Sequence, residues 1–131
     1  MNYIVEFKEE QRIVSARAEG EWDSGTDNGM VREILEMVDS TRSSKVLLDI
    51  RELHFDLPMV QIFERAKEMR EQRRQFGKVS AKAAIVYTPF TPKIEEDMKF
   101  FENAARNRGL PYRMFQDIEE AMVWLIGEHT W

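Results

Sequence analysis

Hydrophobic residues follow two spacings along this chain, and each spacing is typical of one kind of secondary structure. Apolar and polar residues alternate in segment 2–8 and again in segment 14–19. Four consecutive polar residues between these segments, 9–12, suit a turn. The pattern therefore predicts a β-hairpin near the start of the chain.

Four later segments carry apolar residues at the three- and four-residue spacing of an amphipathic helix. These segments lie within residues 31–38, 59–76, 92–109 and 118–125. The stretch 20–29 is the most irregular of the chain, and because several of its residues can cap a helix, the first helix start is fixed only to within one turn. Thr91 and Asp117 are good caps for the last two helices, while Gly77 and Gly109 are natural helix ends.

Three segments are apolar over most of their length and predict further strands, at 46–48, 81–87 and 112–115. The chain is organised around the first of them, which runs directly into Asp49 and Arg51. A strand that is apolar on both faces and ends in charge is typical of the middle of a sheet covered by helices on both sides. In such sheets, ligands and partners bind beyond the carboxyl ends of the strands, so we expect a functional site after residue 48.

The elements follow one another in the order ββαβαβαβα, which is characteristic of the α/β class. A hairpin followed by alternating helices and strands predicts a mostly parallel sheet of about five strands, flanked by four helices and joined by right-handed crossovers. A chain of 131 residues has the size of one domain, so we assign residues 1–131 to a single unit.

The amino-acid composition limits the kinds of function that this chain can have. The net charge of −5 argues against general nucleic-acid binding, although a local basic patch is compatible with it. The absence of cysteine excludes disulfides, thiolate metal sites and cysteine nucleophiles. Charged residues among the first fifteen argue against a secretory signal, and the apolar run 121–126 is too short to cross a bilayer. We therefore expect a cytoplasmic protein.

The acidic, glycine-containing segment 23–29 invites a calcium-loop or phosphate-loop interpretation, and both fail. Gly25 occupies the third calcium-ligand position, and Ile34 stands where the loop needs a glutamate. No lysine follows for a phosphate, and Asp23 and Asp27 would repel it. We therefore interpret the segment as a turn with a helix cap.

Acid–base or nucleophilic catalysis would have to use His54 or His129, which are the only histidines. His129 is the third residue from the end of the sequence, whereas His54 follows the central strand beside Asp49, Arg51 and Asp56. No serine motif accompanies His54, so a hydrolytic role is kept only as a weaker alternative to a surface histidine. The same shortage of ligands leads us to expect no metal and no cofactor.

Two stretches carry a resemblance to a known family. The first is Val46-Leu47-Leu48-Asp49-Ile50-Arg51-Glu52-Leu53, which leads into a long charged helix, and the second is the ending 112–125, with Asp117, two acids, an alanine and Trp124-Leu125. With the order of elements, they make most of the chain resemble the STAS superfamily, in particular its SpoIIAA-like, STAS/SEC14-type bacterial members. The resemblance implies an α/β fold and a non-enzymatic role in protein–protein interaction.

In the phosphorylated anti-sigma antagonists of that superfamily, a serine caps the helix after the central strand and is modified by a kinase. Segment 54–59 contains no serine or threonine here, so we do not expect phosphorylation at that place. Asp56 is the residue that can cap the helix. Its carboxylate also supplies a permanent negative charge where the phosphate would be, and a built-in mimic is the alternative to an ordinary cap.

Three groups of side chains allow either a structural or a binding role. The basic residues Arg70, Arg73, Arg74, Lys78 and Lys82 suit an acidic partner or lipid headgroup, but a solvated helix face is the simpler interpretation. Methionine is frequent, with eight residues, and its helical members suit an irregular core or an adaptable ligand pocket. The aromatic residues Trp22, Phe90 and Trp131 suit burial in a second subunit, so we expect a homodimer.

These observations predict a docking domain whose polar surface lies at the strand ends and the adjacent helix starts. The residues assigned to that surface are Asp49, Arg51, His54, Asp56, Thr88, Phe90 and Thr91. The alternative is a small carrier that holds a lipid or another apolar ligand between a helix and the sheet.

Overall fold

The structure is a computed structural model and describes residues 1–75 and 81–127. Some predictions therefore lie outside the described residues, namely those made for Phe76, Gly77, Lys78, His129 and Trp131.

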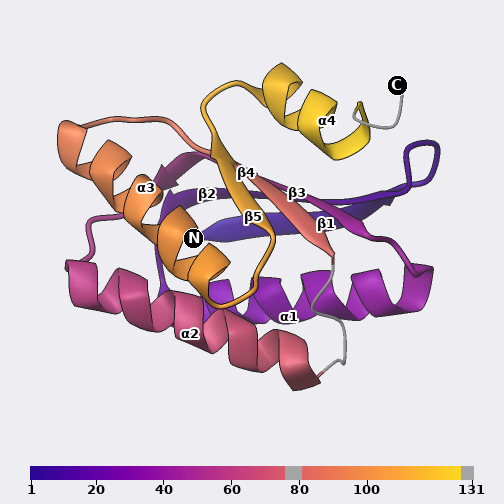
Figure 1. Ribbon diagram of the computed structural model, residues 1–131, viewed down its shortest axis with the longest axis horizontal. Helices are drawn as coiled ribbons and strands as arrows, with labels where there is room; N and C mark the ends of the chain where they lie inside the picture. Colours follow the sequence, from indigo (N-terminus) through magenta and orange to yellow (C-terminus); the bar gives the residue numbers. More distant parts are fainter. Residues whose placement is uncertain (76–80, 128–131) are drawn as a thin grey trace.

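The elements follow the predicted order along the described residues. The strands are β1 (Asn2–Lys8), β2 (Ile13–Glu21), β3 (Lys45–His54), β4 (Lys82–Val86) and β5 (Tyr112–Phe115). The helices are α1 (Ser24–Thr41), α2 (Met59–Gln75), α3 (Pro92–Asn107) and α4 (Ile118–Ile126). Together they confirm an α/β fold of the ββαβαβαβα type (Figure 1).

Within the described residues the strands form one five-stranded sheet in the order β1-β2-β3-β4-β5. β1 pairs with β2 antiparallel, and every later pair is parallel, so the sheet is mixed but mostly parallel as predicted. β3 occupies the centre, and Val46, Leu47 and Leu48 are all buried in it. The prediction of a central strand covered on both faces is therefore confirmed.

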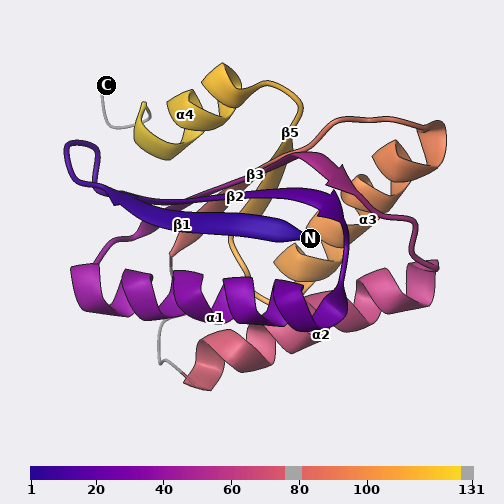
Figure 2. The same cartoon turned by 180° about the vertical axis from the view of Figure 1, so that it is seen from behind.

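The helices form a layer on each side of the sheet (Figures 1 and 2). α1, α2 and α3 lie on one side, over the larger core cluster, which includes Leu48 and Ile50 of β3. α4 lies on the other side, where Leu125 packs in a smaller cluster with Leu47. Alternation along β3 thus sends neighbouring side chains into different cores, which explains why this segment is apolar without a break.

β3 is longer than the apolar run predicted, and this corrects the placement of two site residues. The strand continues through Asp49 and Arg51 to His54, so both charged residues lie inside it rather than after it. The parallel pairing with β2 continues through Gly20 and Leu53 after a shift of register. Backbone pairing with a neighbour therefore extends the strand beyond its apolar part, which sequence hydropathy does not reveal.

The glycine-containing stretch also differs from the prediction, since much of it is helical. α1 begins at Ser24, so Gly25 and Gly29 lie within the helix rather than in an irregular segment. Asp23 is the N-cap, and its carboxylate accepts a hydrogen bond from the Thr26 amide at 2.9 Å. The expectation that a residue of this stretch caps the helix is therefore confirmed. The helix tolerates the two glycines because α1 is held by its buried apolar side.

The predicted caps of the last two helices are confirmed. Thr91 accepts a hydrogen bond from the Ile94 amide at 3.2 Å, and Pro92 follows as the first residue of α3. Asp117 caps α4 by accepting from the Glu119 amide at 2.9 Å. None of the helices in the described ranges combines the length and apolar character needed to cross a bilayer.

Candidate functional site

The end of β3, the loop after β4 and the first turns of α2 and α3 lie at the same end of the molecule (Figures 1 and 2). The loop is tied to β3 by Thr88, whose hydroxyl donates to the Arg51 carbonyl at 3.0 Å. The chain then reaches Thr91, which caps α3. This arrangement brings together side chains that the sequence places almost forty positions apart.

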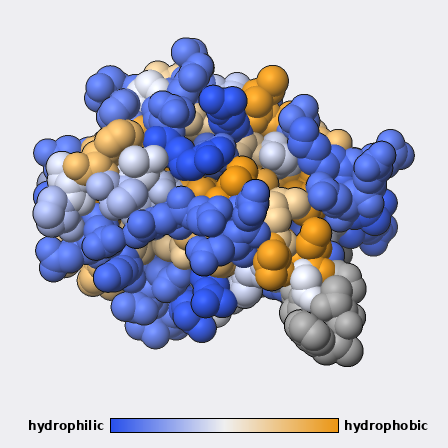
Figure 3. Space-filling view, turned by 90° about the horizontal axis from the view of Figure 1, so that it is seen from above, coloured by the Kyte–Doolittle hydropathy of each residue, from blue (hydrophilic) through white to orange (hydrophobic). Residues whose placement is uncertain are grey.

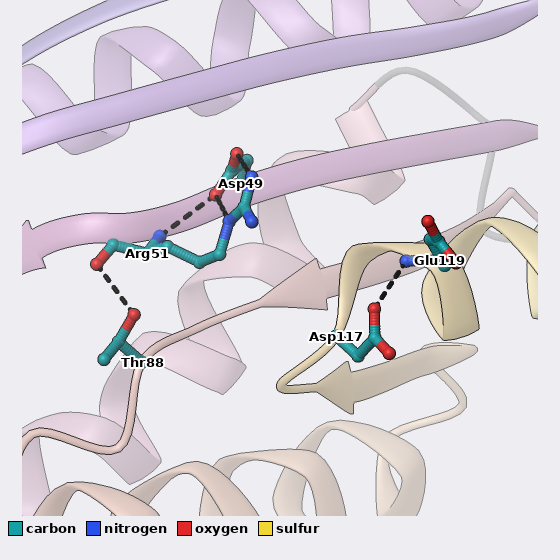
Figure 4. A network of polar contacts seen from close by, with 5 residues as sticks. All are labelled: Asp49, Arg51, Thr88, Asp117 and Glu119. Atoms are coloured by element: carbon teal, nitrogen blue, oxygen red, sulfur yellow. Dashed lines mark hydrogen bonds and ion pairs between the residues drawn. The ribbon is translucent and has the colours of Figure 1, made fainter.

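Asp49 and Arg51 form a bidentate ion pair on the α4 side of the sheet (Figure 4). Arg51 Nε lies 3.0 Å from Asp49 Oδ1, and Arg51 Nη2 lies 2.8 Å from Asp49 Oδ2. The Arg51 amide also donates to Asp49 Oδ1, at 3.1 Å. Two parallel bonds fix the plane of the guanidinium, while 40% of the Arg51 side chain stays exposed.

The local charges keep both members of this pair ionised. Burial raises the pKa of Asp49, but the hydrogen bonds and charge of Arg51, with a further contribution from Arg17, hold that pKa below its usual value. The hydrogen bond to Asp49 raises the pKa of Arg51, and the charges of Glu52 and Asp117 add to the effect. Asp117 lies at the start of α4 near this pair (Figure 4).

His54 and Phe90 form a stacked aromatic pair at the same end of the sheet. Their ring centroids are 4.8 Å apart, with 27° between the ring planes. The His54 carbonyl accepts from the Trp22 amide at 2.9 Å, which anchors the end of the strand. Phe90 is nevertheless 50% exposed, so one large apolar side chain is held in a fixed position on the surface.

The prediction that Asp56 caps the long helix is wrong. The helix begins at Met59, and the amides of Gln61 and Ile62 donate to the Pro58 carbonyl, so the N-cap position is Pro58. Asp56 lies two residues before that position. Its exposed carboxylate instead lies 3.2 Å from Lys93 Nζ on α3.

Lys93 connects this segment to α3 through several oxygens. Its Nζ lies 2.7 Å from Asp97 Oδ2 and donates to the Leu57 carbonyl at 2.9 Å. The hydrogen bond to Asp97 raises the pKa of Lys93, with a smaller contribution from Asp56. The negative charge of Asp56 is therefore already paired within the molecule.

A second candidate site lies between α2 and the sheet, as a cavity of about 80 Å³. Its wall is almost entirely apolar and includes Met30, Met69 and Met98, three methionines that are also part of the core. The charged residues in the wall are Asp27 and Arg65. Both are buried, and Arg65 Nε lies 2.7 Å from Asp27 Oδ2.

Sequence reasoning missed this buried pair, although a signal was present. Arg65 falls on the apolar side of α2 between Ile62, Ala66 and Met69, and Asp27 precedes Met30 and Val31 by one helical turn. A charged residue at a core-facing position of each of two helices indicates a possible ion pair between them.

The basic cluster is not uniformly a solvated helix face, as the sequence had suggested. Arg73 is only 3% exposed, donates to the Ala81 carbonyl at 2.8 Å and lies over the Tyr112 ring. Lys82 lies over the ring of Trp124.

Trp22, expected at a subunit interface, instead packs against the core. No group of three or more potential metal-ligating side chains occurs in segments 1–75 and 81–127.

A solved structure of an anti-sigma factor antagonist from Mycobacterium paratuberculosis has the same arrangement. The likeness covers 95% of this chain and 92% of that chain, with a TM-score of 0.58. The fold is SpoIIAA-like. The resemblance seen in the sequence is thereby confirmed for the fold, whereas 13% identity carries no activity from one protein to the other. No protein-family model and no curated protein matches the sequence.

Proposed function

We propose that this chain is a non-enzymatic regulatory domain of the STAS type, which acts by binding a protein partner. The anti-sigma factor antagonist that shares its fold acts, by its name, on another protein. The proposal extends that mode of action to this chain but names no particular partner. The feature that carries it is the guanidinium of Arg51, which Asp49 holds in a fixed plane while the side chain stays partly exposed.

The proposed docking surface consists of the seven residues assigned to it from the sequence, Asp49, Arg51, His54, Asp56, Thr88, Phe90 and Thr91. A fixed arginine offers directional donors, and an exposed aromatic ring offers apolar area. Thr88 and Thr91 hold the loop in place through bonds within the molecule. A partner therefore meets a surface that needs little ordering on binding, which favours affinity.

Pull-down experiments with variants of this surface test the proposal. Arg51→Ala and Phe90→Ala should each lose a protein that the original chain retains, while circular dichroism stays unchanged. Arg70→Ala is the matched control, because Arg70 is exposed on α2 away from this surface. Retention of the same proteins by Arg51→Ala and Phe90→Ala would show that docking does not use this surface.

A second function, the carriage of a small apolar ligand, is favoured by one observation. The cavity under α2 is lined mainly by apolar side chains and is larger than the space a single water needs. Native mass spectrometry of the freshly purified chain tests this function. A bound small molecule that dissociates on activation is expected, and bare protein that no apolar probe stabilises would contradict it.

A further inference from the structure

The cavity under α2 adjoins a more polar outer pocket. The outer pocket has a volume of about 290 Å³ and includes Ser24, Gln61, Glu64 and Glu68 in its wall. Trp22, Leu57 and Arg65 line both spaces, so these three side chains lie at the boundary between them. A molecule with an apolar part and a polar part can therefore place each part in matching surroundings.

Arg65 lines both spaces, and one of its donors is unused among the described residues. Its Nε and Nη1 are bonded to Asp27 Oδ2 and Asn28 Oδ1, at 2.7 and 2.8 Å. Its Nη2 is fully buried and has no hydrogen-bond partner among the described residues. The whole residue is only 8% exposed, and a buried donor without an acceptor is costly. The position therefore favours a ligand that brings an acceptor.

The surrounding charges select the kind of acceptor. Asp27 already neutralises the positive charge of Arg65 at contact distance. Glu64 and Glu68 add negative charge to the outer pocket and would repel an anion. A carboxylate or phosphate is therefore disfavoured, whereas a hydroxyl or carbonyl oxygen can accept from Nη2 without a charge penalty.

We propose that this cavity binds an uncharged amphipathic molecule whose hydroxyl or carbonyl oxygen accepts a hydrogen bond from Arg65 Nη2. Its short hydrocarbon part occupies the apolar cavity, and any further polar part extends into the outer pocket. The inference rests on the ligand-carrying function proposed above and adds to it the ligand class and the recognising residue.

The test compares hexanol, hexanamide and hexanoate, three probes with equal chain length, in titrations followed by methyl NMR. Hexanol and hexanamide should shift the methyl signals of Leu48, Ile50 and Ile85 saturably, and hexanoate should bind at least fivefold more weakly. Arg65→Lys keeps a cation beside Asp27 but removes the guanidinium fork, so it should weaken hexanol binding about tenfold. Arg70→Lys, outside both pockets, should leave it unchanged.

A second variant keeps the test informative if Arg65→Lys does not fold. Ile62→Phe adds volume at the cavity wall and should abolish binding while the methyl spectrum stays dispersed. If no probe binds, both the ligand-carrying function and the role of Arg65 are wrong. If hexanoate equals hexanol, or folded Arg65→Lys binds hexanol normally, a pocket remains but its assignment to uncharged acceptors through Arg65 is overturned.

Discussion

Arg65 Nε and Asp27 Oδ2 lie 2.7 Å apart and join α2 to α1 across 38 positions of sequence. Both side chains are about nine-tenths buried, so the pair lies inside the larger core rather than on the surface. A buried ion pair contributes little net stability, because desolvation offsets the attraction, but its partners depend strongly on each other. We therefore expect the pair to constrain how these two helices meet.

We expect Asp27→Ala to lower the free energy of unfolding by about 3 kcal/mol, because it leaves the Arg65 charge buried without a counter-charge. Urea denaturation followed by circular dichroism measures the change. Glu71→Ala, which breaks the exposed pair of Glu71 with Arg74, should cost less than about 1 kcal/mol. The double variant Asp27→Ala/Arg65→Met should recover most of the loss, and additive losses would show that the two residues act independently.

Thr91→Ala should lower the free energy of unfolding by about 1 kcal/mol, because the Ile94 amide loses its side-chain acceptor at the start of α3. Thr91→Ser retains the hydroxyl and should stay close to the original chain. The comparison uses the midpoint of urea denaturation. Equal losses in both variants would mean that the threonine methyl group, and not the cap, stabilises this turn.

Much of the fold followed from local signals in the sequence. The unbroken apolar run Val46–Leu48 predicted a strand between two layers, and it lies between the clusters containing Ile50 and Leu125. Caps at Thr91 and Asp117 were readable because a single side chain satisfies helix amides close by in sequence. Such features depend on a few residues that are close together in the sequence.

Features that depend on contacts distant in sequence were not predictable in the same way. Asp56 was expected to cap α2, but Pro58 takes that position and Lys93, 37 positions later, pairs with Asp56. Arg51 was expected after the strand, but pairing with β2 extends β3 beyond it. The approach of Arg65 to Asp27 likewise depends on helix packing, which hydropathy alone does not determine.

Substitution of Arg73 tests whether this side chain is buried, as the structure has it, or solvated, as the sequence suggested. Arg73→Met should lower the free energy of unfolding by about 2 kcal/mol, because the buried Ala81 carbonyl loses a donor and the Tyr112 ring loses its cation. Arg74→Met on the exposed side of α2 should change it by less than about 0.5 kcal/mol. Equal small changes in thermal or urea unfolding would show that Arg73 behaves as a surface residue.

On the side of the sheet where α4 lies, some apolar side chains are exposed, and we expect them to contribute little to stability. Viewed from above, this side is largely hydrophilic, with smaller hydrophobic areas between hydrophilic ones (Figure 3). Ile4 on β1 and Val123 on α4 are each about two-thirds exposed. We expect Ile4→Thr to leave the urea midpoint nearly unchanged, since little apolar area leaves water there on folding. A shift as large as that of Arg73→Met would contradict the exposed position of Ile4.

Because of the ion pair between Asp49 and Arg51, we expect the free energy of unfolding to decrease at low pH. Because the pKa of Asp49 is lower in the folded chain than in the unfolded chain, the unfolded chain takes up a proton first as pH falls. The stabilisation is therefore fully present above an unfolded pKa of about 4 and is lost as pH falls through the lower folded value. Arg51 stays charged throughout, since its pKa is raised.

Asp49→Asn removes this titration while keeping a side chain of similar size. We expect the original chain to be the more stable one at neutral pH, with a gap that narrows as pH falls below about 4. Urea denaturation of both chains at a series of pH values measures the gap. Glu71→Gln is the control, because its carboxylate is exposed on α2. A gap that stays constant down to about pH 2 would show that Asp49 stabilises the strand by its shape rather than by its charge.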